Sequence, residues 1–232
     1  MISQIALKEV EGVEITSLAD NAVDFMSTIV KKEAKQVREW VKERMGEKWA
    51  EKHFRLPFAE HGFSVLIRVV CDGKPHVVLF DTGISSDGVV TNAKRMGLNL
   101  GEIACIVLSH GHYDHFGGLP KVLKAVKKES LPIIVHEDMF RTRGVVNSDG
   151  TMRKYPEIPS ENQVASAKYV KTKQSYLLAD EGILVTGEIP RNTDFEKGLP
   201  RQRVFSNGKW QPDPWVWDER AIVINVKRKG LV

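Results

Sequence analysis

One stretch of the sequence decides the fold: Leu108-Ser109-His110-Gly111-His112-Tyr113-Asp114-His115-Phe116-Gly117-Gly118. Three of the chain's seven histidines lie in one six-residue window of this stretch, residues 110–115. An even spread of seven histidines over 232 residues would place far fewer than one in such a window. The apolar residues 103–108 that lead into the histidines are typical of a strand covered on both faces. We therefore expect a buried strand with a histidine-rich turn at its end.

These side chains predict a metal site. Imidazole nitrogens and carboxylates are good ligands for zinc, manganese and iron. A turn after a buried strand can direct His110 and His112 to one side and Asp114 and His115 toward a neighbouring position, which supports two metal ions about 3.5–4 Å apart. The alternative is a surface loop with incidental histidines, and the strand, the ligand types and the flanking glycines argue against it. Three glycines suit tight turns around the ligands: Gly111, Gly117 and Gly118.

The rest of the chain mixes strand and helix patterns. Residues 63–70 and 76–80 predict a hairpin around the turn 72–75, and the second strand runs into Asp81-Thr82-Gly83. Hairpins combined with helical crossovers indicate an α/β or α+β fold with layered sheets. Further strands are expected at 13–18, 133–136, 182–186 and 221–226, and helices at 89–97 and 119–128.

Two segments interrupt this pattern. Residues 24–52 carry apolar side chains at helical spacing among Lys, Arg and Glu, which predicts one long amphipathic helix or two short ones. We interpret 20–60 as a helical insertion in a single domain that spans 1–232. Residues 141–166 are polar and rich in Pro, Gly and Ser, so we expect a long surface excursion there.

The His-x-His-x-Asp-His segment resembles the hallmark of the metallo-β-lactamase-fold superfamily. Phe80-Asp81-Thr82-Gly83 is similar to the first motif of that superfamily. The resemblance implies a four-layer αββα sandwich in which His110, His112, Asp114 and His115 bind two divalent ions. It also implies that Asp81 supports the site from behind the ligands, with His110 or His112 as its natural partner.

Three other segments carry a narrower resemblance: residues 59–64, 92–95 and 186–198. They are similar to the branch that includes the archaeal dihydropterin–ribofuranosylaminobenzene phosphate synthases and many bacterial relatives. The similarity extends from about residue 15 to residue 232. It implies a second candidate chemistry, the joining of a dihydropterin diphosphate to an aminobenzene ribotide.

Two residues after a predicted strand are further site candidates. Glu188 occupies a place where the superfamily often has another histidine ligand, so it is a candidate carboxylate ligand; a helix-cap or loop carboxylate is the alternative. Arg191 could hold a phosphate through charge-assisted hydrogen bonds, or it could form a surface salt bridge.

Several weaker candidates have simpler explanations. A lone histidine such as His61 is more often structural than a neighbour of metal ions, and the role of His136 at a strand end is open. Asp20 and Asn21 suit a capping role. Three tryptophans either line a substrate pocket or cover an edge of the core: Trp210, Trp215 and Trp217.

The C-terminal region departs from the pattern of the superfamily, because no histidine follows His136. The resemblance implies further ligands in this region, including a late histidine. Residues 227–230 form a credible hairpin turn, yet only two residues follow it, whereas strands usually run about 5–6 residues. We expect either that the fold is shortened at its C-terminus or that a partner, such as a second copy, completes the sheet and the site.

The composition is that of an ordinary soluble globular protein. Of 232 residues, 42% are hydrophobic and 28% are charged, with a formal net charge of +4. No apolar run approaches the roughly 20 residues that span a bilayer, no signal peptide is visible, and Cys71 and Cys105 are too few for a disulfide framework. A cytoplasmic location is therefore expected. The sequence pI of about 9.0 is a weak argument for a nucleic-acid partner, which we do not expect.

Together these observations predict a metal-dependent hydrolase-type enzyme that acts on a small-molecule substrate, with a phosphorylated substrate as one option. Two divalent ions are the expected cofactors: zinc first, with manganese, iron or magnesium as alternatives. We assign catalytic roles to Asp114, Asp81 and Arg191. The alternatives are a pterin-type transferase and a catalytically incomplete metal-binding fragment.

Overall fold

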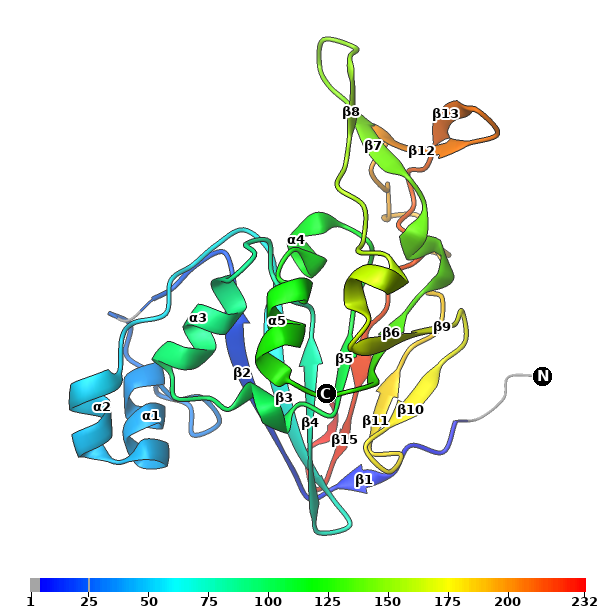
Figure 1. The fold of residues 1–232 in the computed structure, drawn as a ribbon. Helices are drawn as coiled ribbons and strands as arrows, with labels where there is room; N and C mark the ends of the chain where they lie inside the picture. The colour runs from blue at the N-terminus through cyan, green and yellow to red at the C-terminus, as the bar shows by residue number, and fades with distance from the viewer. Residues whose placement is uncertain (1–4, 25) are drawn as a thin grey trace.

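A six-stranded mixed sheet forms the centre of the protein. The computed structural model describes residues 5–24 and 26–232 (Figure 1). The first three strands of the sheet are antiparallel and the others run parallel to β4. In spatial order the strands are β2 (Gly12–Ala19), β3 (Ser64–Cys71), β4 (Lys74–Phe80), β5 (Cys105–Val107), β6 (Leu131–Val135) and β9 (Ala167–Lys171).

The hairpin between β3 and β4 is confirmed, with a tighter turn than expected. Asp72 and Gly73 both have positive φ angles, 51° and 72°, which suits a two-residue hairpin turn. The turn sets Val65 opposite Phe80. Because β5 pairs in parallel with β4, Phe80 lies beside Val107, and the chain leaves both strands at the same edge of the sheet.

Two helices, α3 (Gly88–Arg95) and α5 (Leu119–Val126), pack on one face of this sheet. The apolar side chains of α5 recur at positions that share one side of a helix, and all four are buried: Leu119, Val122, Leu123 and Val126. They join a core that includes Leu79 and Ile106 from the sheet. The binary pattern of the sequence therefore positions this layer.

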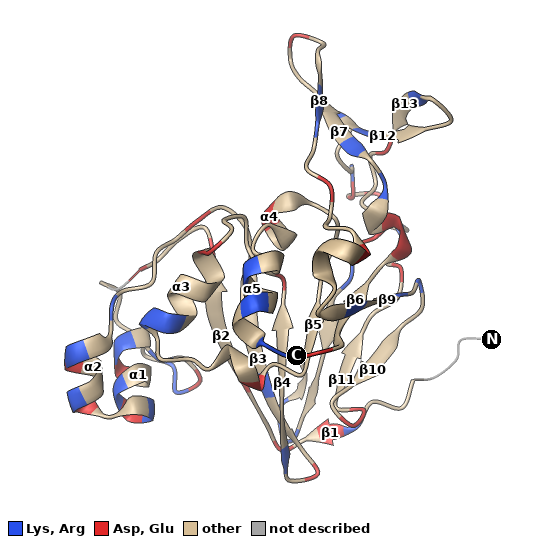
Figure 2. Ribbon diagram, in the orientation of Figure 1, with Lys and Arg blue, Asp and Glu red and all other residues tan. Residues whose placement is uncertain are grey.

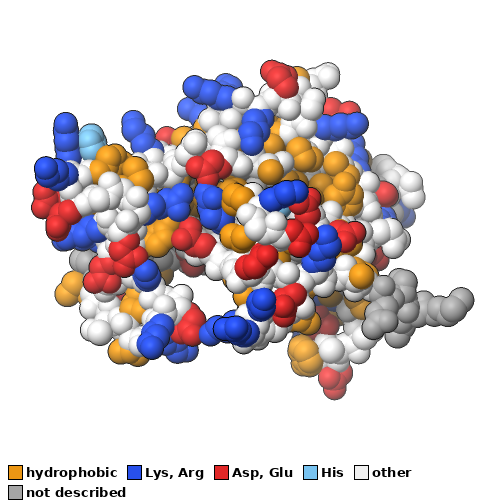
Figure 3. Space-filling model, turned by 90° about the horizontal axis from the view of Figure 1, so that it is seen from below, with side chains coloured by type: hydrophobic (Ala, Val, Ile, Leu, Met, Phe, Trp, Pro, Cys, Tyr) orange, Lys and Arg blue, Asp and Glu red, His pale blue; other side chains and the backbone are white. Residues whose placement is uncertain are grey.

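The predicted helical insertion is two short helices, α1 (Val37–Met45) and α2 (Glu47–His53), beside the β2 edge (Figure 1). Gly46 separates them with a φ of 85°, a left-handed conformation that excludes one continuous helix. The helices begin later than the sequence pattern suggests, since residues 26–36 have no helical assignment. Basic and acidic residues alternate along both helices (Figure 2). On the face of the molecule seen in Figure 3, basic and acidic side chains are likewise interleaved.

The other face of the six-stranded sheet is covered by a second layer of strands. Val69, Val78 and Ile134 from the large sheet share a buried core with Ile183 and Ile224 from this layer. The layer has two three-stranded parts: β10 (Tyr176–Leu178), β11 (Ile183–Val185) and β14 (Ile222–Val223), and β1 (Glu9–Val10), β15 (Asn225–Val226) and β16 (Gly230–Leu231). The described residues thus form one layer of helices and two layers of strands, which are three of the four layers of the expected αββα sandwich.

The expected surface excursion over residues 141–166 includes regular strands that the sequence pattern does not indicate. This segment contains β7 (Arg143–Val146) and β8 (Met152–Lys154), which join β12 (Gln202–Ser206) and β13 (Lys209–Pro212) in a four-stranded sheet that projects from the body (Figure 1). The strands are short and carry many polar residues, so they lack the apolar alternation that marks a strand packed on a core. None of the helices in the described ranges is long and apolar enough to cross a membrane.

Candidate metal centre

The site begins where β4 and β5 end side by side. Asp81 follows β4, is fully buried and has a φ of 60°. Ser109 lies two residues beyond β5 and donates twice to the Asp81 carboxylate: its backbone N–H to Oδ1 at 2.7 Å and its Oγ to Oδ2 at 2.7 Å. The parallel pairing of the two strands therefore places the aspartate beneath the histidine loop.

Asp81 and Ser109 each engage the Nδ1 atom of one imidazole ring. His115 lies in the short helix α4 (Tyr113–Phe116), and its Nδ1 is 2.7 Å from Asp81 Oδ2. His110 Nδ1 is 3.0 Å from Ser109 Oγ. Because each Nδ1 is engaged, each Nε2 is left as the ligating atom, which is the usual arrangement of histidine ligands. The direct partner of Asp81 is thus His115, and its link to His110 runs through Ser109, whereas the sequence pointed to His110 or His112.

All four predicted loop ligands lie together. The ring of His110 is 4.7 Å from that of His112 and 4.1 Å from that of His115, between centroids. The Asp114 carboxylate is 3.6 Å from His115 Nε2. It is also 3.2 Å from Nε2 of His61, a mostly exposed side chain. The structure therefore brings His61 to the edge of the site.

Burial and neighbouring charge set the protonation of the rings. Burial lowers the pKa of His110 to about 2. Burial, with help from the Arg143 guanidinium, also lowers the pKa of His112. Burial acts in the same direction on His115, but the hydrogen bond to Asp81 and its charge outweigh it and raise the pKa of His115. His110 and His112 are therefore neutral at pH 7, with a lone pair free to bind a cation.

The donor set fits a divalent metal. Two neutral imidazoles, a third held from behind by a carboxylate, and Asp114 are the ligand types that zinc, manganese or iron take. Within residues 5–24 and 26–232, no three His, Cys, Asp or Glu side chains already converge on a single metal position. The ligands are thus gathered by the fold, and a bound cation would have to draw them into their final geometry.

Gly117 and Gly118 are required by close backbone packing rather than by the tight turns that the sequence predicted. Gly117 and Gly118 have ordinary negative φ angles of −56° and −81°. A Cβ on Gly117 would lie 2.1 Å from the Ile84 carbonyl oxygen, and one on Gly118 would lie 2.3 Å from the Thr82 carbonyl oxygen. The histidine loop packs directly on the backbone that follows β4, and only glycine permits that approach.

Glu188 is placed against His136. The fully buried His136 accepts from the Asp138 N–H at Nδ1 (3.1 Å), so its Nε2 carries the proton toward Glu188 Oε2 at 3.2 Å. The Glu188 carboxylate also lies 4.0 Å from Lys173 Nζ. The described contacts of Glu188 are with these residues, and its role as a metal ligand stays a prediction.

Arg191 is tied to carboxylates. Its guanidinium pairs with Glu196 at 2.8 Å and with Glu219, and it donates to the Val216 carbonyl at 3.2 Å. These contacts match the salt-bridge alternative, so phosphate binding stays a prediction. Glu219 itself lines a cavity of about 450 Å³ together with His110 and His115. That cavity is polar at the histidine end and otherwise apolar, with Phe63, Ile67, Phe80, Ile222 and Ile224 among its walls.

The other candidates lie farther from the chemistry. Asn21 Oδ1 accepts a hydrogen bond from His61 Nδ1 at 3.2 Å, and the Asp20 carboxylate accepts the Asn21 N–H at 2.7 Å. Neither residue caps a helix, because the next helix in the described residues, α1, starts at Val37. The three tryptophans do not line the cavity beside His110 and His115. They pack among themselves and their neighbours: Trp210 against Phe205, and Trp215 against Trp217.

Sequence reasoning missed three residues that hold the loop: Ser109, Arg143 and Asp218. Ser109 adjoins the histidines, and its place between a buried strand and a ligand was a usable signal. Asp218 accepts from the Gly111 N–H at 2.7 Å and pairs with Arg143, although it lies 107 positions from Gly111. No local pattern in the sequence indicates a contact over that separation.

The chain is similar to several known proteins. The family model of the Metallo-beta-lactamase superfamily matches residues 58–202. The 7,8-dihydropterin-6-methyl-4-(beta-D-ribofuranosyl)-aminobenzene-5'-phosphate synthase of Methanocaldococcus jannaschii is 32% identical over 190 residues, 77% of this chain and 62% of that protein. The probable metallo-hydrolase YflN of Bacillus subtilis is 32% identical over 83 residues, 33% of this chain and 30% of that protein.

Among solved structures, a quorum-quenching N-acyl homoserine lactone lactonase aligns over 97% of this chain and 73% of its own, with 14% identity and a TM-score of 0.44. This chain spans 62% of the length of the archaeal synthase and 50% of that of a second, uncharacterized protein from the same archaeon.

A sandwich of helices and two strand layers, with a His-x-His-x-Asp-His turn at the end of a buried strand, defines the metallo-β-lactamase fold class. The match to the family model covers more than half of the 232 residues. The chain belongs to the metallo-β-lactamase superfamily.

Proposed function

We propose that this chain provides the site of a metal-dependent, hydrolase-type enzyme that acts on a small molecule. The observation that carries the proposal is the gathering of His110, His112, Asp114 and His115 beside the buried Asp81, with His110 and His115 lining a cavity. Two divalent ions would be held by these four side chains, with zinc as the first candidate and manganese, iron or magnesium as alternatives. Glu188 is a further candidate ligand.

When bound, such cations polarise a carbonyl or phosphoryl group and acidify water near neutral pH. The residues of the chain have separate tasks. Asp81 holds His115 by Nδ1 and, through Ser109, holds His110, so both rings keep a fixed tautomer. Asp114 presents a carboxylate 3.2 Å from Nε2 of His61. The apolar walls of the cavity would exclude water around the substrate.

A pterin-type transferase is the second candidate, and the 32% identity to the archaeal synthase over 77% of this chain favours it. In that reaction the site would stabilise a departing diphosphate, and Arg191 would contribute its charge if Glu196 or Glu219 released it. The two functions separate on their products: hydrolysis of generic phosphodiesters and lactones with added zinc or manganese supports the first. Condensation of a dihydropterin diphosphate with an aminobenzene ribotide supports the second.

The metal assignment is tested by elemental analysis of the purified protein and of a His112→Ala variant. We expect the wild-type chain to retain divalent metal and the variant to lose most of it, since one of four gathered ligands is gone. His53→Ala, at an exposed position on α2, is the matched control and should keep its metal. Equal metal content in wild type and His112→Ala would refute the ligand assignment.

The cellular location is also a proposal. Both cysteines, Cys71 and Cys105, are buried and free. Burial raises the pKa of the Cys105 thiol to about 12, so that thiol stays protonated and unreactive. Unpaired cysteines fit a reducing compartment, and we place the protein in the cytoplasm.

A further inference from the structure

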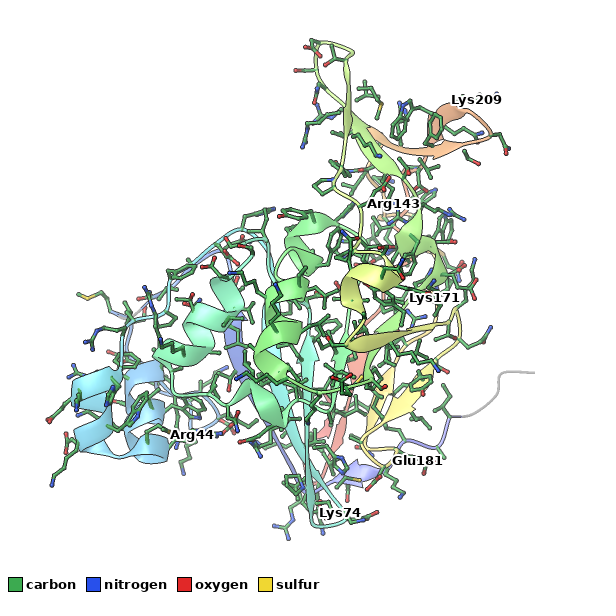
Figure 4. All side chains as sticks on the ribbon, viewed as in Figure 1. Arg44, Lys74, Arg143, Lys171, Glu181 and Lys209 are labelled. Atoms are coloured by element: carbon green, nitrogen blue, oxygen red, sulfur yellow. The ribbon has the colours of Figure 1, made fainter. Side chains whose placement is uncertain are left out.

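The histidine loop is held from the side opposite Asp81 by a buried ion pair. Arg143, the first residue of β7, donates from Nη1 and Nη2 to the two carboxylate oxygens of Asp218, both at 2.8 Å. The Asp218 side chain is fully buried and that of Arg143 is 6% exposed. Figure 4 shows Arg143 where the projecting four-stranded sheet meets the body. A two-pronged contact of this kind fixes both partners in distance and in orientation.

The same carboxylate reaches the metal-binding loop. Asp218 Oδ2 accepts the backbone N–H of Gly111 at 2.7 Å, and Gly111 is the residue between His110 and His112. Gly111 also lies flush against the pair, because a Cβ there would be 2.9 Å from Arg143 Nη1. Two residues after Asp218, the Arg220 N–H donates to the Ser109 carbonyl at 2.8 Å. Residues 218–220 thus run along the loop and fasten it at two points.

We propose that Asp218 and Arg143 are positioning residues of the metal centre: the Arg143–Asp218 pair, through the Gly111 N–H, sets the angle between the His110 and His112 rings. The proposal rests on the proposed metal site. Asp81 fixes the loop from the β4 side and the pair fixes it from the β7 side, so the two rings stand at 86° to one another with 4.7 Å between centroids. Neither residue is among the proposed ligands, and both would act through the loop backbone.

Two substitutions separate positioning from general stability. Asp218→Asn keeps an oxygen acceptor for the Gly111 N–H but turns an amide toward one arm of the guanidinium. Arg143→Lys keeps the charge but loses the fork. Val126→Ala, in the core face of α5 and outside the loop, is the control for loss of stability alone.

The first measurement is titration of each metal-free protein with Co²⁺, followed by its visible absorption, together with the melting temperature. We expect Asp218→Asn and Arg143→Lys to bind Co²⁺ about 10- to 100-fold more weakly than wild type, with an altered spectrum. Val126→Ala should lower the melting temperature and leave the Co²⁺ affinity and spectrum unchanged. Wild-type affinity and spectrum in both pair variants would overturn the proposal, as would an equal loss of affinity in Val126→Ala.

A metal-free measurement keeps this inference apart from the proposed function. Amide hydrogen exchange of residues 108–116 should accelerate in Asp218→Asn and Arg143→Lys, while exchange of α5 stays at the wild-type rate. Unchanged exchange of the loop overturns the positioning role whether or not metal binds. If the wild-type protein binds no Co²⁺ but the exchange rates behave as expected, the proposed metal function fails and the fastening of the loop by the pair stands.

Discussion

At the scale of single residues, the site is built from pairs in which one side chain fixes another. Asp81 engages His115 and Ser109, and Ser109 engages His110, so a single buried carboxylate orders two rings. The environment of each ring then decides its charge. Burial keeps His110 neutral, whereas Asp81 favours a proton on His115. Neighbouring histidines of one loop thus have opposite pKa shifts for identifiable reasons.

These shifts predict a pH dependence of stability in the metal-free protein. Below about pH 6.5 the unfolded chain takes up protons on His110 and His112, which the folded chain resists because it lowers both pKa values. The unfolded state then binds more protons, so the free energy of unfolding falls as the pH falls. His115 acts in the opposite sense: its raised pKa adds stability that is present below 6.5 and is lost as the pH rises through the folded value.

The measurement is urea unfolding of the metal-free wild type and of His110→Asn from pH 7 down to about pH 5. The slope of the free energy of unfolding against pH should be smaller in the variant, by up to about 1.4 kcal/mol per pH unit, which is the effect of one proton. His53→Asn, at an exposed position, should keep the wild-type slope. Identical slopes in wild type and His110→Asn would contradict the burial argument.

At the scale of elements, polar side chains connect the segments that surround the site. Asn92 in α3 is buried, and its Nδ2 donates to the Leu18 carbonyl at 2.8 Å and to the Phe58 carbonyl at 2.9 Å. Its Oδ1 accepts the Phe58 N–H at 3.1 Å. One amide therefore joins α3 to the end of β2 and to the segment that leads toward His61. Asn92 therefore has a structural role, although it lies outside the site.

Asn92→Ala should lower the free energy of unfolding by about 3 kcal/mol, because it leaves buried backbone groups of Leu18 and Phe58 without partners. Asn99→Ala is the comparison: its exposed side chain accepts only the Gly101 N–H, so the loss should be about 1 kcal/mol. Chemical denaturation of both variants gives the two values. Equal losses of unfolding free energy in the two variants would contradict the larger stabilising role of the buried Asn92 amide.

At the scale of the whole molecule, the features that depend on local patterns could be predicted from the sequence. These are β2, β3, β4, β5 and β6 of the six-stranded sheet, the helices on its face and the clustering of His110, His112, Asp114 and His115, since an apolar strand run and its terminal turn are contiguous in the chain. The sequence pattern does not indicate the sixth strand, β9. The projecting sheet could not be predicted, because its strands are short and polar and the pairing of β7 with β12 joins segments about 60 residues apart. The Arg143–Asp218 contact spans 75 positions and has no local signature.

Exposed apolar side chains on the edge strands of two sheets predict self-association. Ile15 on β2 is 57% exposed, and Leu231 on the edge strand β16 is 70% exposed. An apolar strand edge invites pairing with another chain, whereas a charged edge resists it. Sedimentation velocity should show concentration-dependent association that Leu231→Lys reduces. Val30→Lys, at another exposed apolar position, should leave it unchanged; equal association of wild type and Leu231→Lys would contradict a role for the β16 edge.

The contact between Asp218 and Gly111 has a consequence during protein synthesis. All four loop ligands are translated by residue 115, but the residue that anchors their loop comes 107 positions after Gly111. At the ordinary speed of a ribosome, that interval is about 5–20 seconds. During this interval the three histidines and the aspartate lie on a loop that can contact Asp81 but has no contact with Asp218. Under the proposed function, secure capture of a cation would therefore follow completion of this region, and a ribosome that stalls before residue 218 would leave the loop without its Asp218 anchor.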